Sequence, residues 1–352
     1  MGASVKRAQL VLNIILLFIG GGGSPLLTRL YFVRGGNRVW FSSWLQTAGF
    51  PILLLPIAIS YFSHRRASQN SSSPDGHVNK FFMNYRLFFA SVIIGVLTGL
   101  DDFLMANGME RIPVSTSALI SATQLAFTAG FAFLLVRQKF TSYSVNALVL
   151  LTIGAAVLAM HGKSDKPENE STGQYILGFA MMIGAAALYG FIMPFLELTY
   201  AKGGQEITYA LVMQIQMVIC LIATGFSTIG MLVNNDFQAI PREARNYTLG
   251  ETKYYMVVIW SAIGWQFSFL GVIGIVFCAS SLLSGIMVTL LIPVTQIFGV
   301  IFLREKFQAE KGVALALSIW GFVSYFYGEI KALKNPKNIP ETEMSQPSNP
   351  LV

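Results

Sequence analysis

The segments that decide the fold are SALIS at 117–121 and SGIMV at 284–288. Each leads through a long apolar run to a short basic segment, RQKF at 137–140 and REKF at 304–307. The two copies stand about 167 positions apart, close to half the length of the 352-residue chain. A period this long, with apolar runs between the repeated segments, indicates a chain built as two copies of one set of helices.

A second pair of segments repeats at nearly the same distance. PLLT at 25–28 is followed by Tyr31, and PFLE at 194–197 is followed by Tyr200. Membrane proteins built from two such copies are commonly secondary transporters, in which the substrate binds where the copies meet. The repeat therefore predicts both a fold and a class of function.

Composition places the chain in a lipid bilayer. Hydrophobic residues make up 54% and charged residues 12%, about half the charged fraction of soluble domains. The net charge of +7 does not indicate nucleic-acid binding, because the Lys and Arg residues lie between apolar runs and suit lipid headgroups. The two cysteines offer no disulfide framework or metal cluster, and we find no catalytic motif, metal site or cofactor motif. The sequence therefore favours a protein that is not an enzyme.

Ten runs are long and apolar enough to cross a membrane, which takes roughly 20 residues each. They lie at 8–32, 41–61, 85–107, 115–136, 142–160, 174–199, 207–232, 254–277, 280–303 and 311–329. Because five is odd, the second set of five enters the membrane upside down relative to the first. The sequence predicts an all-α polytopic membrane protein with ten transmembrane helices in two inverted five-helix repeats. Its expected parts are an N-terminal tail at 1–7, repeats at 8–160 and 174–330, a linker at 161–173 and a disordered C-terminal tail at 331–352.

Orientation has weak signals. Lys and Arg divide equally between the two predicted sides, so the positive-inside rule gives no answer. Of three possible glycosylation sequons, Asn169 and Asn246 lie opposite the termini and Asn70 lies on their side. This majority favours cytosolic termini.

Two adjacent carboxylates, Asp101 and Asp102, lie midway along the third span. An ionised, unpaired carboxylate at the bilayer centre costs about 2.5–3.5 kcal/mol on insertion scales. We therefore predict a proton-coupling or substrate-anchoring site, against the alternative of a structural, hydrogen-bonded carboxylate. Successive helical residues point about 100° apart, so only one faces the substrate. Asp102 shares a stripe with Gly95 and Gly99, which indicates close helix packing on that side.

The fourth span carries one polar face. Ser117, Ser121, Gln124 and Thr128 follow at i, i+4, i+7 and i+11, and we predict that Gln124 in particular lines a substrate cavity. For the hydroxyl residues, helix packing is the alternative. The matching positions of the second copy are Ser284, Val288, Leu291 and Thr295.

Aromatic and amide side chains in the second half suit a flat heteroaromatic ring. Trp265 is placed to stack on such a ring and Gln266 to bind its edge, whereas Trp260 lies near the span's entrance, where an interfacial anchor is the alternative. Gln214 and Gln216 on the seventh span are weaker candidates, for which lining and packing are equally good interpretations.

Interruptions at matching places in both halves are a further pointer to a binding site. Gly22, Gly23 and Pro25 predict a break in the first span, and Pro194 predicts one in the sixth. Glu197, three residues after Pro194, is either a second proton-coupling group or an interfacial carboxylate.

Several segments together resemble the plant purine permeases, a family of the drug/metabolite transporter superfamily. They are GGSPLLTRLYF at 22–32, GGNRVW at 35–40, QTAGFP at 46–51, PVSTS at 113–117, FQAEKG at 307–312 and YFYGEI at 325–330. The resemblance follows the same order over nearly the whole chain and implies ten spans. It also implies proton-coupled uptake of adenine-like bases, cytokinins and related heteroaromatics at the plasma membrane. Met105 and Asn107 stand where the family often has Tyr, which leaves the substrate open.

The expected activity is import of purine bases by alternating access, in which a protonated Asp101 or Asp102 and a neutral heterocycle load together. The expected partners are a small heteroaromatic substrate, protons and the lipid bilayer, with no cofactor, metal or nucleic acid. Uptake of alkaloids or vitamin B6 by the same kind of permease is the alternative, and a channel is the alternative from another class.

Overall fold

A computed structural model describes residues 3–70, 82–111, 114–138, 140–160, 172–303 and 309–334. Within these ranges the regular structure is entirely helical. The elements are α1 (Ala3–Val33), α2 (Val39–Thr47), η1 (Phe50–Leu53), α3 (Leu54–Asn70), α4 (Tyr85–Arg111), α5 (Val114–Val136), α6 (Ser142–Met160), α7 (Thr172–Lys202), α8 (Tyr209–Val233), α9 (Asp236–Asn246), α10 (Glu251–Cys278), α11 (Ser281–Leu303) and α12 (Ala309–Lys334).

Six segments of the described chain are long and apolar enough to cross a membrane. They are Val5–Phe32, Val39–Arg66, Tyr85–Gly108, Ile176–Lys202, Tyr209–Val233 and Glu251–Cys278. Three shorter apolar helices are Thr123–Val136, Ser142–Gly154 and Ser281–Ile292. The prediction of a polytopic, all-helical membrane protein is therefore confirmed. The predicted tail at 331–352 is wrong in its first residues, since α12 continues to Lys334, and the predicted linker residues 161–171 lie outside the described ranges.

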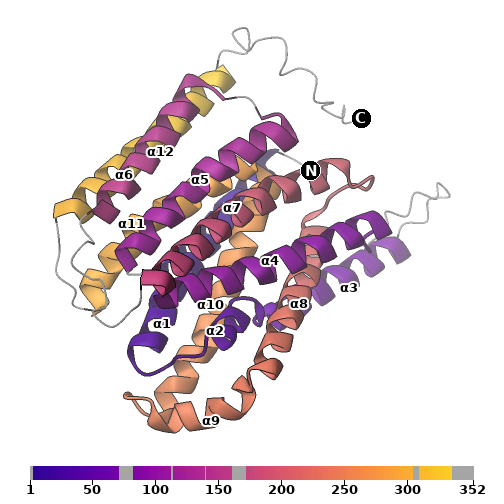
Figure 1. Ribbon diagram of the computed structural model, residues 1–352. Coiled ribbons are helices and arrows are strands. Elements are labelled where there is room, and N and C mark those ends of the chain that lie inside the picture. Colours follow the sequence, from indigo (N-terminus) through magenta and orange to yellow (C-terminus); the bar gives the residue numbers. More distant parts are fainter. Residues whose placement is uncertain are drawn as a thin grey trace.

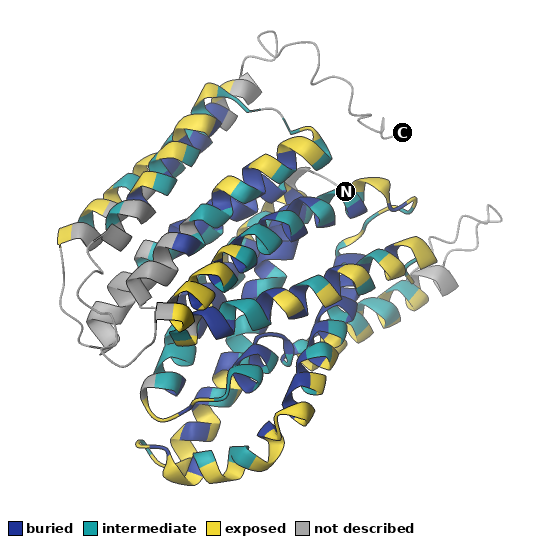
Figure 2. Cartoon of the chain, viewed as in Figure 1, coloured by how far each residue is buried: buried dark blue, intermediate teal, exposed yellow. Residues whose placement is uncertain are grey.

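Surface and interior follow the requirements of a bilayer. Large apolar side chains are exposed along the outer helix faces, Leu55, Leu134 and Val233 among them, while buried residues lie where helices meet (Figure 2). Many hydroxyl and amide side chains are buried inside. This arrangement suits lipid outside and a polar route inside.

The helices pack as a bundle in which distant parts of the chain lie side by side (Figure 1). α1 packs along α10, α4 along α7 and α8, α5 along α7, and α6 along α12. α9 is a short polar helix at the end of the bundle away from the N-terminus (Figure 1).

The predicted breaks in the first and sixth spans are wrong. α1 continues through Gly22, Gly23 and Pro25, and α7 continues through Pro194. A proline inside a membrane helix frees few backbone groups, which neighbouring helices and local adjustment can satisfy. The glycine-rich run of α1 has another use, because a side chain at Gly20 would overlap the backbone of α10. Small residues here allow two helices to approach closely.

The second span, in contrast, is interrupted. α2 ends at Thr47, the 3₁₀ helix η1 covers Phe50–Leu53, and α3 follows. Gly49 marks the interruption, and a Cβ atom there would overlap the backbone of Ala262 on α10. The chain is thus irregular where it packs against the middle of α10.

Hydroxyl groups join α2 to α8. Ser43 and Ser227 are hydrogen-bonded at 3.1 Å, and Thr224 donates to Thr47 at 3.0 Å. Such bonds between membrane helices contribute about 0.6–2 kcal/mol each. They connect the two halves of the chain beside the interruption at Gly49.

The close approach of α1 and α10 predicts different effects for two glycines of the same helix. Gly20→Ala places a methyl group against the α10 backbone, whereas Gly23 has open space. We expect Gly20→Ala to lower the free energy of unfolding by about 1–3 kcal/mol, as overpacking does. Gly23→Ala is the matched control and gains the same helix propensity.

The measurement is the apparent Tm of each purified variant in detergent. The expected order is Gly20→Ala below wild type and Gly23→Ala at or above it. Equal Tm values for the two variants would contradict the close packing of α1 on α10.

Candidate functional site

A buried polar cluster lies where α4, α8 and α10 meet. It consists of Asp102 on α4, Gln216 and Cys220 on α8, and Gln266 on α10, all at most 2% exposed. Gln216 Nε2 donates to Cys220 Sγ at 3.1 Å. The Asp102 carboxylate and the Gln266 carboxamide are both close enough to interact with the same thiol. We call these four residues the central cluster.

Glycines bring the backbone around the central cluster together. Gly95 and Gly99 of α4 lie against side chains of α8, and no larger residue fits there without a shift. Gly49 lies against Gln266 Cβ of α10. The predicted packing stripe of Gly95, Gly99 and Asp102 is therefore confirmed, and it turns Asp102 toward α8.

Apart from the weak interaction of the Gln266 carboxamide with the Cys220 thiol, four polar atoms of the central cluster have no hydrogen-bond partner within the part of the chain that the structure describes. They are Asp102 Oδ2, Gln216 Oε1, and both Nε2 and Oε1 of Gln266. Each such buried atom costs about 1–3 kcal/mol, and native proteins contain few of them. Four in one place therefore mark a site prepared for a ligand or water. It offers an N–H donor and several oxygen acceptors in a setting that excludes bulk solvent.

Asp101 faces a different neighbour. It is buried like Asp102, but its charge interacts with Tyr189 of α7. Successive helical residues point about 100° apart, so the two adjacent carboxyl groups have different surroundings. Asp102 belongs to the central cluster, and Asp101 lies within electrostatic range of Tyr189.

The side chains of Trp265 and Gln266, although adjacent in sequence, contact different parts of the protein. Its Nε1–H donates to Thr28 Oγ1 at 3.2 Å, and Thr28 Oγ1 lies 3.5 Å from Ser261 Oγ. This bond ties α10 to α1, while Gln266 faces α8 and Gly49. The predicted pairing of a stacking ring with an edge-binding amide is therefore not present in this conformation.

Trp260 lies on the outside of the bundle, 57% exposed. It lines a groove of about 370 Å³ between α1 and α10, together with Ile19, Met256 and Phe267. The walls are almost wholly apolar and offer few groups that bind the edge of a base. Its position fits the interfacial anchor that the sequence allowed.

The remaining candidates lie on α5 and on α8. Ser121 and Gln124 are half-buried on α5, whose main neighbours are α6, α7 and α11. Thr128 Oγ1 donates to the Gln124 backbone carbonyl at 2.9 Å, beside Gly285 of α11, which is a helix-packing position. Gln214 is buried on α8 and has an interaction partner.

Glu197 belongs to α7, and its side chain lies against the start of α11. Its Oε2 accepts the Ser281 backbone N–H at 2.7 Å, so the carboxylate caps that helix and complements its dipole. It takes no part in the central cluster.

Sequence reasoning missed Cys220 and Tyr189. Cys220 follows Gln216 by four residues, a spacing that places both on one face of α8. Tyr189 has no comparable signal, because only the packing of α7 on α4 brings it to Asp101.

Comparison with known proteins supplies the family. A family described as purine nucleobase transmembrane transport matches residues 8–335. Purine permease 3 of Arabidopsis thaliana is 50% identical over 98% of this chain and 99% of its own length, and purine permease 2 of the same plant is 48% identical over 97% of each. A solved crystal structure of another protein, 10% identical, superposes with a TM-score of 0.54 over 92% of this chain and 96% of its own, which shows a shared fold.

The unpaired amide of Gln266 predicts that an apolar replacement does not harm folding. Gln266→Met removes two buried polar atoms without a partner at nearly constant volume, and we expect the free energy of unfolding to rise by about 1 kcal/mol. The matched control is Asn13→Leu. Asn13 is also fully buried, but it donates to Gln9 O at 2.7 Å and accepts from Tyr209 OH at 2.9 Å.

Apparent Tm values of the two purified variants in detergent check this prediction. Gln266→Met is expected at or above wild type and Asn13→Leu below it. A Gln266→Met variant as unstable as Asn13→Leu would mean that the Gln266 amide is a structural hydrogen-bonding group.

Proposed function

The chain belongs to the purine nucleobase transmembrane transport family, and from this premise we propose that it imports adenine-like bases together with protons by alternating access. As a member it is a multi-pass membrane transporter and not an enzyme. The substrate, the coupling ion and the transport cycle are the parts that we propose.

The unpaired atoms of the central cluster carry the proposal. Adenine presents ring nitrogens that accept hydrogen bonds and an amino group that donates them. Gln266 offers a donor and an acceptor on one planar amide, and Gln216 Oε1 offers a second acceptor. A site built to bind both kinds of group rejects molecules that lack them, since its own polar atoms would then stay unpaired.

Asp102 is the residue we propose for proton coupling. Its second oxygen is buried without a partner, so an ionised carboxylate here is costly and a protonated one can donate to a ring nitrogen. Loading would then require proton and base together, and release of the proton toward a less acidic cytosol would favour release of the base. Asp101, beside Tyr189, is the secondary candidate.

The architecture we propose is ten spans in two inverted repeats, with cytosolic termini in the plasma membrane. Helix packing supports the repeat, because a contact between a helix of one half and a helix of the other has a counterpart in which the two halves change places. α1 packs on α10 and on α11, just as α7 packs on α4 and on α5. α2 likewise packs on α10 where α8 packs on α4.

A second candidate substrate is a cationic alkaloid. Asp101 beside Tyr189 joins a carboxylate to an aromatic ring, and such a pair suits an amine cation. A cationic substrate would bind to Asp101 in its ionised form. The pH dependence of its uptake would therefore differ from that of a neutral base.

The deciding experiment is uptake of labelled adenine into yeast that lacks its own purine permease, at external pH 5 and pH 7.5, with and without a protonophore. We expect saturable uptake, faster at pH 5 and abolished by the protonophore. Gln266→Met should lower it at least about tenfold, the effect of losing about 1.4 kcal/mol of binding. Asp102→Asn should remove the acceleration at pH 5, and Asp101→Asn should retain it.

Controls use Gly23→Ala and surface labelling of each variant, so that loss of protein is not read as loss of transport. Full pH-dependent uptake by both Asp variants would contradict carboxylate coupling. No adenine uptake by a wild-type protein present at the cell surface would contradict the substrate and bring the alkaloid to first place. Uptake that never saturates and never exceeds equilibrium would identify a channel.

A further inference from the structure

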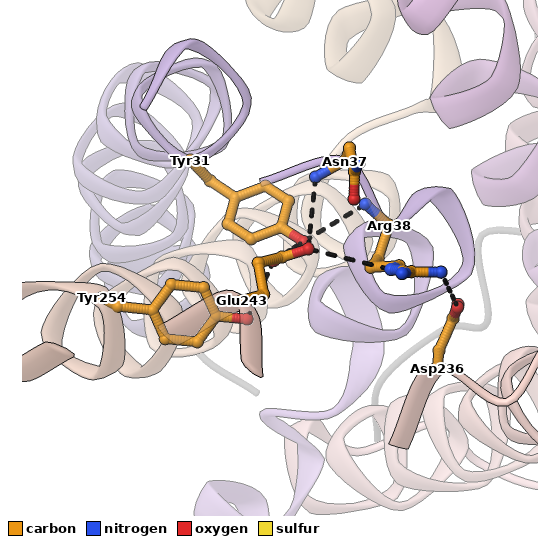
Figure 3. Close-up of polar contacts among 6 residues, drawn as sticks. All are labelled: Tyr31, Asn37, Arg38, Asp236, Glu243 and Tyr254. Atoms are coloured by element: carbon orange, nitrogen blue, oxygen red, sulfur yellow. Dashed lines mark hydrogen bonds and ion pairs between the residues drawn. The ribbon is translucent and has the colours of Figure 1, made fainter. Parts of the chain in front are cut away.

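Five side chains at the α9 end of the bundle form a second polar cluster, which we call the α9 latch: Tyr31, Arg38, Asp236, Glu243 and Tyr254 (Figure 3). They come from the end of α1, the residue before α2, both ends of α9 and the first turn of α10. None of them belongs to the central cluster.

Glu243 is the centre of the latch. Its Oε1 accepts hydrogen bonds from Tyr31 OH at 2.5 Å and from Tyr254 OH at 3.0 Å. Its Oε2 accepts the Asn37 backbone N–H at 3.4 Å. Both tyrosine rings are buried, so one carboxylate joins the end of α1 to the start of α10 inside the protein.

Arg38 lies between the two acidic residues of α9 (Figure 3). Its guanidinium is 3.4 Å from Asp236 Oδ1 and 3.8 Å from Glu243 Oε2. The carboxylate of Asp236 is fully buried, and burial raises its pKa above the ordinary value while Arg38 acts to lower it. One cation therefore holds two carboxylates in place, with its own side chain 36% exposed at the outer edge.

Further bonds fasten the same two segments. Thr248 donates to the Arg34 carbonyl from its backbone N–H at 3.2 Å and from its hydroxyl at 3.2 Å. Tyr247 OH donates to the Leu30 carbonyl at 3.0 Å. All these contacts join the first half of the chain to the second, at one end of the bundle.

The latch adjoins the interior of the bundle. Tyr31 also borders a gap too narrow for a water molecule, together with Thr28, Ser42, Ser261 and three apolar side chains. Thr28 is the residue that accepts from Trp265, one position before Gln266. Tyr31 of the latch and the Thr28–Trp265 bond thus lie along the same contact between α1 and α10.

We propose that the α9 latch is the gate that closes the transport route at this end and opens in every cycle. The inference rests on the proposed alternating access, in which the two halves must separate at each end in turn. Its contacts suit that role, because hydrogen bonds and ion pairs can be exchanged for bonds to water once the joined segments part. Asp236 Oδ2 and Arg38 Nε have no hydrogen-bond partner among the described residues in the closed state, and opening would give both atoms access to water.

A disulfide across the gate tests this without touching any latch side chain. Arg34→Cys combined with Thr248→Cys joins the two segments where Thr248 is already bonded to the Arg34 backbone. Oxidation is expected to lower adenine uptake at least tenfold, and a reductant is expected to restore it. Each single cysteine variant, treated in the same way, is the control. Uptake at the wild-type rate with the cross-link formed would overturn the gate.

A second readout does not depend on transport. A cysteine at Ser42 lies under the latch, and one at Ser43 points instead to Ser227 of α8. We expect a water-soluble thiol reagent to label Ser42→Cys at least fivefold faster when Arg38→Gln is also present, with Ser43→Cys unchanged. If Arg38→Gln fails to fold, Tyr254→Phe replaces it, since it removes one hydrogen bond to Glu243.

The two readouts separate the two proposals. Unchanged labelling of Ser42→Cys in the latch variants overturns the gate, whatever the substrate is. Faster labelling together with no adenine uptake by the wild-type protein supports the gate and sinks the proposed substrate.

Discussion

Polar atoms inside a membrane bundle cannot form hydrogen bonds with bulk water, so their partners must lie in the protein or in the molecule that it carries. Most buried polar groups described here follow this rule within the protein. Asn13 bonds to Gln9 and Tyr209, and the α2–α8 contact consists of paired hydroxyls. The central cluster does not follow it, and its four unpaired atoms are the reason to place the binding site there and not in the apolar groove on the outside.

α10 connects the α9 latch with the central cluster. It carries Tyr254 of the latch at its first turn, then Trp265, and then Gln266 of the central cluster. It also packs along α1 through glycine positions such as Gly20, where the two backbones are in direct contact. Even a small separation of the two helices would break this contact. A tilt of α10 against α1 would therefore change the latch and the site together. This provides a physical route by which opening at one end and binding in the middle can depend on each other.

Much of this could be predicted from the sequence, and particular residues show why. The repeat and the apolar runs predict a polytopic helical bundle. The Gly95–Gly99 stripe predicts close packing on the side of Asp102, but it leaves open which of the two carboxylates faces the substrate. Gln216 and Gln266 could be recognised as polar residues within apolar spans, but not as neighbours, because only tertiary packing brings α8 and α10 together. The break predicted at Pro25 is wrong since neighbouring helices compensate for a membrane proline, and the actual interruption is at Gly49. The latch had no signal at all, because Arg38 and Glu243 read as ordinary charges in polar connections.

The most direct test of the central claim is the structure of the purified transporter with adenine bound, determined by electron cryo-microscopy in lipid nanodiscs. We expect density for the base within hydrogen-bonding distance of the Gln266 amide, with Gln216 and Asp102 as further neighbours. Density for the base elsewhere, for instance in the groove beside Trp260, with the Gln266 amide enclosed by protein, would contradict it.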